Sequence, residues 1–207
     1  MDRLPKHLLE HLQLIEWRLI YLKSEVNAME RIDAHLADAT ILNTVGDALP
    51  FSNLYAEQTT LVVFVRHFGC IFCRERLADL AEALPLLEAH GMGAVAIGNG
   101  TPLMAEAFSE TLKVDIPIYT DPSRDIFKKA EMKRNFGLGF ATIKQGLRSW
   151  KAGHRQGAVA GDPWQQGGCL LIRPDGLILA AERDHRAGDI IDFQTTVRQA
   201  IDAVDAA

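Results

Sequence analysis

The segment LVVFVRHFGCIFC, residues 61–73, joins a run of five apolar residues to two cysteines spaced C-x-x-C. The apolar run predicts a buried strand, and leucines at helical spacing predict a helix from Cys70 to His90. A strand that leads into a helix places both thiols at the first turn of that helix. The helix dipole and the free N–H groups favour negative charge there, and the thiolate is the reactive form of cysteine. This segment therefore predicts a redox-active dithiol formed by Cys70 and Cys73.

The composition is that of an ordinary globular protein, with 48% hydrophobic and 24% charged residues in a chain of 207. A net charge of −5 does not indicate a nucleic-acid-binding surface. Apolar runs are far shorter than the about 20 residues of a membrane span, and the first residues lack the apolar core of a signal peptide. We therefore expect a cytoplasmic protein. In that reducing compartment, three cysteines with one C-x-x-C pair indicate redox chemistry rather than a disulfide scaffold.

Residues 1–40 are expected to form a separate amphipathic segment. Large apolar residues recur at alternating spacings of four and three from Leu8 to Met29, which predicts a heptad seam on a long helix over residues 6–36. That seam either packs against the chain's own domain or forms a homodimer, and the sequence leaves both alternatives open.

Residues 41–207 are expected to form the main domain, because strand and helix patterns alternate along them. Strands are expected over 61–65, 94–97 and 116–119, and the helices that follow them over 70–90, 102–112 and 121–132. After a glycine-rich stretch come two strands that flank a turn, over 169–173 and 177–181, and a last helix over 189–204. This order predicts a parallel core extended by an antiparallel hairpin. The expected fold is α/β: a thioredoxin-like mixed sheet flanked by helices.

Three blocks of sequence carry a resemblance to a known family. They are residues 64–75 around the C-x-x-C motif, residues 165–170 (QQGGCL) and residues 183–189 (RDHRAGD). In these blocks the chain resembles the peroxiredoxin-like group of the AhpC/TSA superfamily, which includes the prostamide/prostaglandin F synthase type. The resemblance covers residues 42 to 205. It implies a thiol-dependent oxidoreductase that needs no cofactor or metal and is reduced by an external thiol such as thioredoxin or glutathione.

Two positions depart from the related families. Conventional peroxiredoxins carry P-x-x-x-T-x-x-C, and alignment on Cys73 puts Arg66 at the proline and Cys70 at the threonine. Thioredoxins carry a cis-proline opposite their C-x-x-C motif, at a position where this chain has Gly168. The resemblance therefore implies a site intermediate between the two families.

Cys70 is the favoured attacking thiol, because it stands at the first turn of the helix beside Gly69, and Cys73 would then resolve. The peroxiredoxin alignment reverses these roles, and the order stays open.

His67 is a candidate for stabilising the thiolate or moving a proton, since the ordinary pKa of histidine lies near neutrality. Its alternative role is packing at the end of the strand.

The resemblance also implies that Arg183 stabilises the thiolate and the polarised peroxide; the alternative is an exposed charge at a strand end. Arg66 is expected to point away from the site and form a salt bridge, because side chains alternate along a strand. Cys169 is expected to be either a small core residue or a third redox thiol. The aromatic residues of the glycine-rich stretch would form either a lid or a minor core: Phe140, Trp150 and Trp164.

Three functions remain open at this point. The first is reduction of a peroxide or a related oxidised substrate by the dithiol. The second is reduction of an endoperoxide or a specialised metabolite, as in the prostamide synthase type. The third is a redox-switched binding protein without turnover, with the N-terminal helix as its partner surface. A zinc site is disfavoured because the chain has no second C-x-x-C pair.

Overall fold

The computed structural model describes residues 30–112, 115–135 and 160–205, and the chain from Ile32 onward forms one compact unit. The long helix expected over residues 6–36 lies outside the described residues as far as residue 29. Residues 30–33 are not helical, so the prediction is wrong at that end. A separate short helix, α2 (Ala34–Ala37), begins there, and its Leu36 packs in the core of the compact unit.

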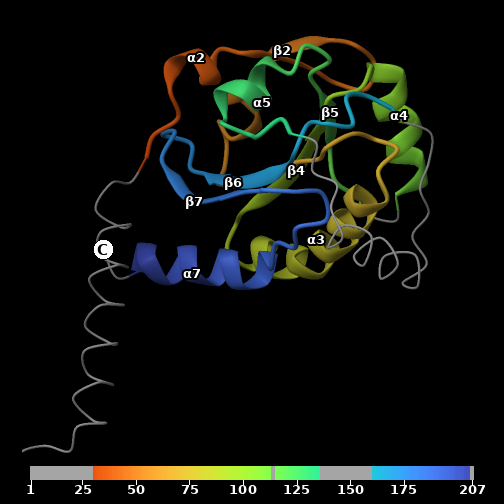
Figure 1. The fold of residues 1–207 in the computed structure, drawn as a ribbon. Helices are drawn as coiled ribbons and strands as arrows, with labels where there is room; N and C mark the ends of the chain where they lie inside the picture. The colour runs from red at the N-terminus through yellow and green to blue at the C-terminus, as the bar shows by residue number, and fades with distance from the viewer. Residues whose placement is uncertain (1–29, 113–114, 136–159, 206–207) are drawn as a thin grey trace, which may run out of the picture. The chain divides into compact units, whose positions relative to one another are not determined.

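A seven-stranded mixed sheet forms the centre of the unit, in the order β2-β1-β5-β4-β3-β6-β7 (Figure 1). Strands β3, β4 and β5 are parallel, β6 and β7 extend the sheet antiparallel, and β1 pairs antiparallel with β5. This arrangement confirms the predicted fold class. The strands are β1 (Thr40–Leu42), β2 (Ala48–Pro50), β3 (Thr60–Phe64), β4 (Gly93–Gly98), β5 (Ile118–Thr120), β6 (Gly168–Ile172) and β7 (Ile178–Arg183).

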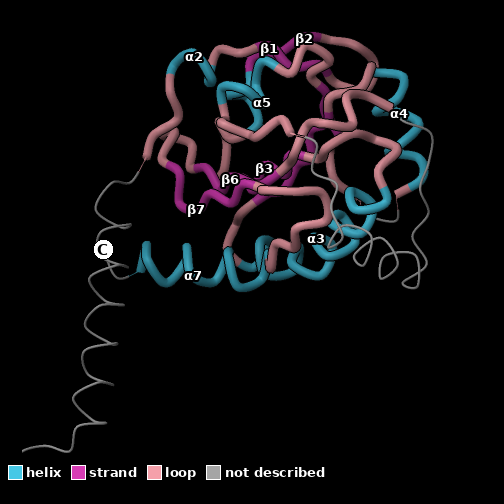
Figure 2. Tube along the Cα trace, viewed as in Figure 1, coloured by secondary structure: helices cyan, strands magenta, loops and turns pink. Residues whose placement is uncertain are grey.

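Helices cover both faces of the sheet (Figures 1 and 2). On one face lie α3 (Ile71–Ala89) and α7 (Phe193–Asp205), and on the other lie α2 and α5 (Asp125–Lys129). Helix α4 (Pro102–Thr111) packs beside β5, and a 3-10 turn, η1 (Phe51–Leu54), follows β2. Within the described residues, none of these helices has the length and apolarity needed to cross a bilayer.

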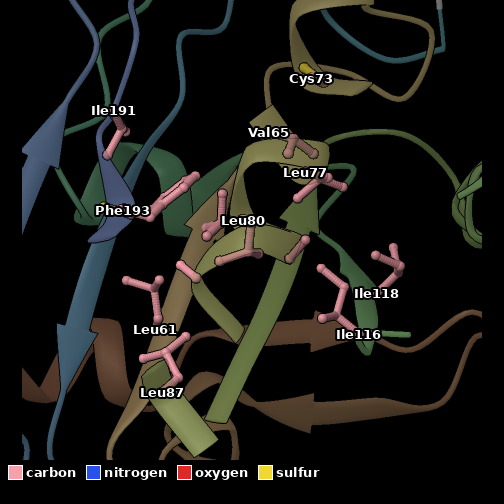
Figure 3. Packing of buried hydrophobic residues seen from close by; sticks show 14 of the residues in the cluster. Leu61, Val65, Cys73, Leu77, Leu80, Leu87, Ile116, Ile118, Ile191 and Phe193 are labelled. Carbon is pink, nitrogen blue, oxygen red and sulfur yellow. The ribbon is translucent and has the colours of Figure 1, made fainter. Parts of the chain in front are cut away.

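Strand β3 lies between two apolar cores, which explains its uninterrupted apolar sequence. Leu61 and Val63 face the core under α3 and α7, whereas Val62 and Phe64 face the core under α2 and α5. Figure 3 shows the first core, where side chains of β3 and α3 meet Phe193 of α7. The strand is thus fixed from both sides, and it delivers the following turn to a defined place.

The helix expected over residues 121–132 is shorter than predicted. The Asp121 carboxylate accepts hydrogen bonds from the N–H groups of Ser123 and Ile126, both at 2.9 Å. Arg124 has a φ of 64°, in the left-handed region, which does not continue a helix. Residues 121–124 therefore form a turn, and α5 begins only at Asp125.

Candidate active site

Cys70 occupies the N-cap of α3, at the end of a tight turn that follows β3. Its N–H donates to the His67 carbonyl at 3.1 Å, and its own carbonyl accepts from the Arg74 N–H at 3.3 Å. Cys70 is 2% exposed and Cys73 is 3% exposed, and no disulfide joins them. The structure therefore brings the two cysteines of the predicted dithiol together at the start of α3, where the surrounding protein encloses them.

The two thiols differ in acidity. A hydrogen bond from Cys73 lowers the pKa of Cys70 to about 6, against burial, and the Arg66 charge and the Phe72 N–H act in the same direction. Burial raises the pKa of Cys73 well above its ordinary value, and the neighbouring Cys70 raises it further. Near pH 7 Cys70 is therefore the thiolate and Cys73 the thiol, which supports Cys70 as the attacking group.

Arg66 points toward the site, which corrects the expectation from strand alternation. Its Nη1 donates to the Cys70 sulfur at 3.4 Å, its Nε donates to the Gln165 carbonyl at 3.2 Å, and its Nη2 donates to the Pro163 carbonyl. The side chain is buried. The expectation failed because β3 ends at Phe64, so the period of two does not extend to residue 66.

The Arg66 charge has a distinctive environment. Across the three described ranges, no carboxylate lies within 4.0 Å of its guanidinium. Its other partners are neutral carbonyls, so the Cys70 sulfur is the contacting atom that can carry a negative charge. Because a buried charge is costly unless it is paired, this contact favours the thiolate.

His67 is buried beside the same turn, and its Nδ1 accepts a hydrogen bond from the Gly69 N–H at 3.3 Å. Burial, followed by the charge of Arg66, lowers the pKa of His67 to about 4. The ring is therefore neutral near pH 7 and carries its proton on Nε2. In this state it offers no positive charge to the thiolate.

Arg183 is the last residue of β7, opposite Gly168 in the register. Its Nε donates to the Ala130 carbonyl at 3.0 Å, and its guanidinium lies 3.6 Å from the Glu131 carboxylate. Ala130 directly follows α5, so these contacts lie on the face opposite α3. None of them brings Arg183 to Cys70.

Cys169 lies in β6 opposite Val63 and is fully buried in the core under α3. Burial raises its pKa to about 12, so it stays a protonated core thiol at neutral pH. In the described part of the chain, no three Cys, His, Asp or Glu side chains gather as metal ligands.

Of the three aromatic residues expected to form a lid or a minor core, Phe140 and Trp150 lie outside the described residues. The backbone N–H of the third, Trp164, donates to the Asp162 carboxylate at 2.9 Å.

A buried ion pair one turn beyond Cys73 was not anticipated. Arg76 donates to both carboxylate oxygens of Asp184, at 2.7 and 2.8 Å, and to the Asp189 carbonyl at 2.9 Å. The pair attaches α3 to the loop that contains the third sequence block. In the sequence, Arg76 falls among the apolar positions of the predicted helix. A charged residue at such a position is the signal that could have revealed a buried ion pair.

The AhpC/TSA antioxidant enzyme family model matches residues 79–186, just over half of the chain. The chain is 33% identical to human peroxiredoxin-like 2C over 169 residues, 75% of this chain and 74% of that protein. It is 33% identical over 160 residues to the chloroplastic thioredoxin-like protein AAED1 of Arabidopsis thaliana, covering 72% of this chain and 64% of that protein, less than two thirds of its length. Human prostamide/prostaglandin F synthase is 30% identical over 159 residues, 72% of this chain and 78% of that protein.

Solved structures share the fold at low sequence identity. Peroxidoxin BcpB from Mycobacterium tuberculosis has a TM-score of 0.58 at 15% identity, covering 86% of this chain and 97% of that one. A Chlorobium tepidum structure described as a putative thiol:disulfide interchange protein DsbE has a TM-score of 0.54 at 14% identity, covering 85% and 99%. These likenesses concern the fold alone. On the family match and the relatives at 30% identity or more, the chain belongs to the AhpC/TSA antioxidant enzyme family, in its peroxiredoxin-like group.

Proposed function

We propose that this chain is a thiol peroxidase in which Cys70 attacks and Cys73 resolves. The Cys70 thiolate donates its electron pair to one oxygen of a peroxide, and the O–O bond breaks. Cys70 becomes a sulfenic acid, and the second oxygen takes up a proton and leaves as water or an alcohol. The Cys73 thiol then attacks the sulfenic sulfur, a Cys70–Cys73 disulfide forms, and water leaves.

The contact between the Arg66 guanidinium and the Cys70 sulfur carries this proposal. A fixed positive charge lowers the pKa of the attacking thiol and also stabilises the charge that develops on the leaving oxygen. Arg66 thus takes the electrostatic role that the family resemblance had implied for Arg183. The proton for the leaving oxygen comes from solvent, and the neutral His67 ring offers only a hydrogen bond from its Nε2.

An external thiol completes the proposed cycle. Two thiol equivalents, from glutathione or from a thioredoxin-type dithiol, reduce the Cys70–Cys73 disulfide and are themselves oxidised to a disulfide. The proposed setting is the cytoplasm, where such reductants are available. The proposal requires no metal, flavin or nucleotide.

Thiol counting on the reduced chain tests the assignment. Mixing with hydrogen peroxide or cumene hydroperoxide should consume two thiols per chain, with Cys70 and Cys73 joined in the product identified by mass spectrometry. Cys70→Ser should abolish the fast reaction, Cys73→Ser should stop at the sulfenic acid, and Cys169→Ser is the matched control that should react normally. A Cys70→Ser variant that reacts as fast as the parent would refute the assignment.

A parallel reaction with a cyclic endoperoxide separates the two enzymatic alternatives. Faster consumption of the endoperoxide than of both hydroperoxides would favour the prostamide-synthase type. Redox-dependent association without turnover, in the presence of thioredoxin and its reductase, would instead favour a redox-switched binding protein.

A further inference from the structure

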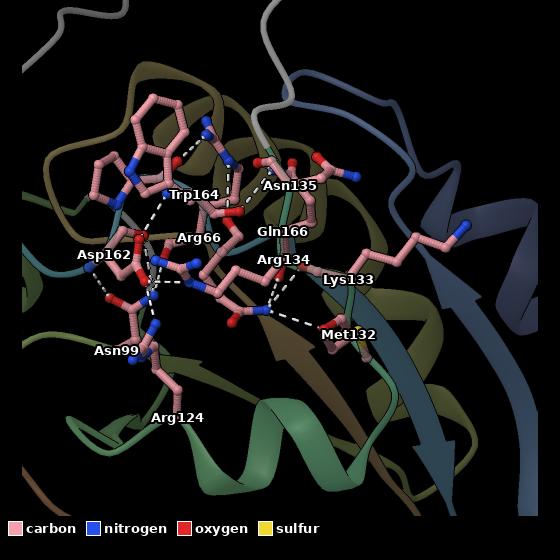
Figure 4. Close-up of polar contacts among 12 residues, drawn as sticks. Arg66, Asn99, Arg124, Met132, Lys133, Arg134, Asn135, Asp162, Trp164 and Gln166 are labelled. Carbon is pink, nitrogen blue, oxygen red and sulfur yellow. Dashed lines mark hydrogen bonds and ion pairs between the residues drawn. The ribbon is translucent and has the colours of Figure 1, made fainter.

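Asn99 joins two parts of the chain that meet beside the candidate active site. It follows the last residue of β4 and is 4% exposed. Its Nδ2 donates to the Arg66 carbonyl and to the Asp162 carbonyl, and its Oδ1 accepts from the Asp162 N–H at 2.7 Å. Figure 4 shows Asn99 and Asp162 together on one side of Arg66. The carboxamide therefore ties the backbone of Arg66 to the backbone of Asp162.

Asp162 in turn fixes the segment that follows it. Its carboxylate accepts from the Trp164 N–H at 2.9 Å and from the Arg134 Nε at 2.8 Å, and it pairs with the Arg124 guanidinium (Figure 4). These partners come from the turn before α5, from the stretch after α5 and from the segment itself. Asp162 is thus held from three directions.

The segment held in this way supplies the carbonyls that orient Arg66. The Gln165 carbonyl accepts from the Arg66 Nε, and the Pro163 carbonyl accepts from its Nη2. The third guanidinium nitrogen, Nη1, lies 3.4 Å from the Cys70 sulfur. Ala160, at the start of the same segment, accepts from the Phe68 N–H at 3.1 Å. The direction of the guanidinium is therefore set from outside the C-x-x-C motif.

We propose that Asn99 and Asp162 are positioning residues of the thiol site: they hold residues 160–165 against Arg66 and so keep its charge on the Cys70 sulfur. Neither residue touches a reacting atom; both act through Arg66. The proposal rests on the proposed function only in taking Cys70 as the reactive thiolate.

The test measures the acidity of Cys70 without any peroxide. Reduced full-length chains are alkylated with iodoacetamide from pH 4 to pH 9, and the rate at Cys70 is followed by mass spectrometry. In Asn99→Ala and Asp162→Ala the midpoint of the profile should move upward by about one pH unit, which is about tenfold less thiolate below the midpoint. Asp162→Asn keeps an acceptor for the Trp164 N–H and should shift the midpoint less.

Two matched controls separate positioning from general destabilisation. Asn43→Ala removes an asparagine whose Oδ1 holds a turn between β1 and β2, and Asp125→Asn removes the exposed pair with Lys129. Both should leave the midpoint unchanged. If Asn99→Ala and Asp162→Ala lower the thermal midpoint but leave the alkylation midpoint in place, the positioning role is refuted.

A double-variant cycle tests whether the effect passes through Arg66. In an Arg66→Met background, Asn99→Ala should add no further shift, because the charge it positions is already gone. A full additional shift would overturn the proposal. If the wild-type chain does not react with peroxides but the variants show the predicted shifts, the proposed function is refuted and the positioning role stands.

Discussion

The Arg66 guanidinium lies 3.4 Å from the Cys70 sulfur, and its other hydrogen bonds go to the neutral carbonyls of Pro163 and Gln165. In the described part of the chain, this buried cation therefore finds a negative partner only when Cys70 is ionised. The pairing is mutual: the arginine makes the thiol acidic, and the thiolate compensates the arginine. Both effects disappear when either residue is replaced.

Arg66→Met should raise the pKa of Cys70 from about 6 toward its ordinary value of 9. The thiolate fraction at pH 7 should then fall by about tenfold or more, because a thiol whose pKa lies one unit above the ambient pH is only about one-tenth ionised. The pH profile of iodoacetamide alkylation measures this change. Arg198→Met, at an exposed position of α7, is the control and should leave the profile in place. An unchanged profile in Arg66→Met would contradict the pairing.

Cys73 should tune Cys70 through a hydrogen bond, since that bond is the largest influence lowering the Cys70 pKa. Cys73→Ala removes the donor and should raise the pKa. Cys73→Ser replaces it with a hydroxyl donor, so the rise should be clearly smaller. Absorbance of the thiolate at ultraviolet wavelengths during a pH titration distinguishes the two variants. Equal shifts in both would show that the hydrogen bond is unimportant.

The stability of the reduced protein should depend on pH through Cys70. Its folded pKa of about 6 lies below the ordinary 9, so between these values the unfolded chain binds more protons. The free energy of unfolding should rise with pH across this window, by at most about 1.4 kcal/mol per pH unit, and this contribution is lost as the pH falls through 6. Urea unfolding with a reductant present measures the slope. Cys70→Ser should lack this component, and an identical slope in that variant would contradict the low pKa.

The buried Arg76–Asp184 pair should matter far more for stability than surface pairs do. Asp184→Asn leaves the Arg76 charge buried without a carboxylate, which should cost about 3–5 kcal/mol of unfolding free energy. Lys129→Met, which breaks a half-exposed pair with Asp125, should cost about 0–1 kcal/mol. Urea denaturation of both variants makes the comparison. Similar losses of unfolding free energy in the two variants would mean that the Arg76 charge does not need the Asp184 carboxylate, and would contradict this prediction.

The order of the main strands and helices could be predicted, because long apolar periodicities determine it. The hairpin of β1 and β2 could not, since strands of three residues are too short to show a period. The start of α5 was misplaced because Asp121 bonds to Ser123 and Ile126 instead of capping the helix directly.

The candidate site was predictable only in part. The place of Cys70 and Cys73 at the start of α3 follows from local sequence. The direction of Arg66 does not, because it depends on the residue at which β3 ends and on carbonyls about a hundred positions later in the chain. Arg183 could not be placed on a face of the sheet without the register that sets it opposite Gly168.

Cys70 and Cys73 belong to one uninterrupted piece of backbone, the cap and first turn of α3. Both the oxidation and the reduction in the proposed cycle therefore take place within a single secondary-structure element, and no distant segment has to move to the reacting sulfur. Crystals of the reduced chain should accordingly tolerate oxidant diffused into their solvent channels. Successive chemical states could then be trapped within one lattice by freezing at timed intervals.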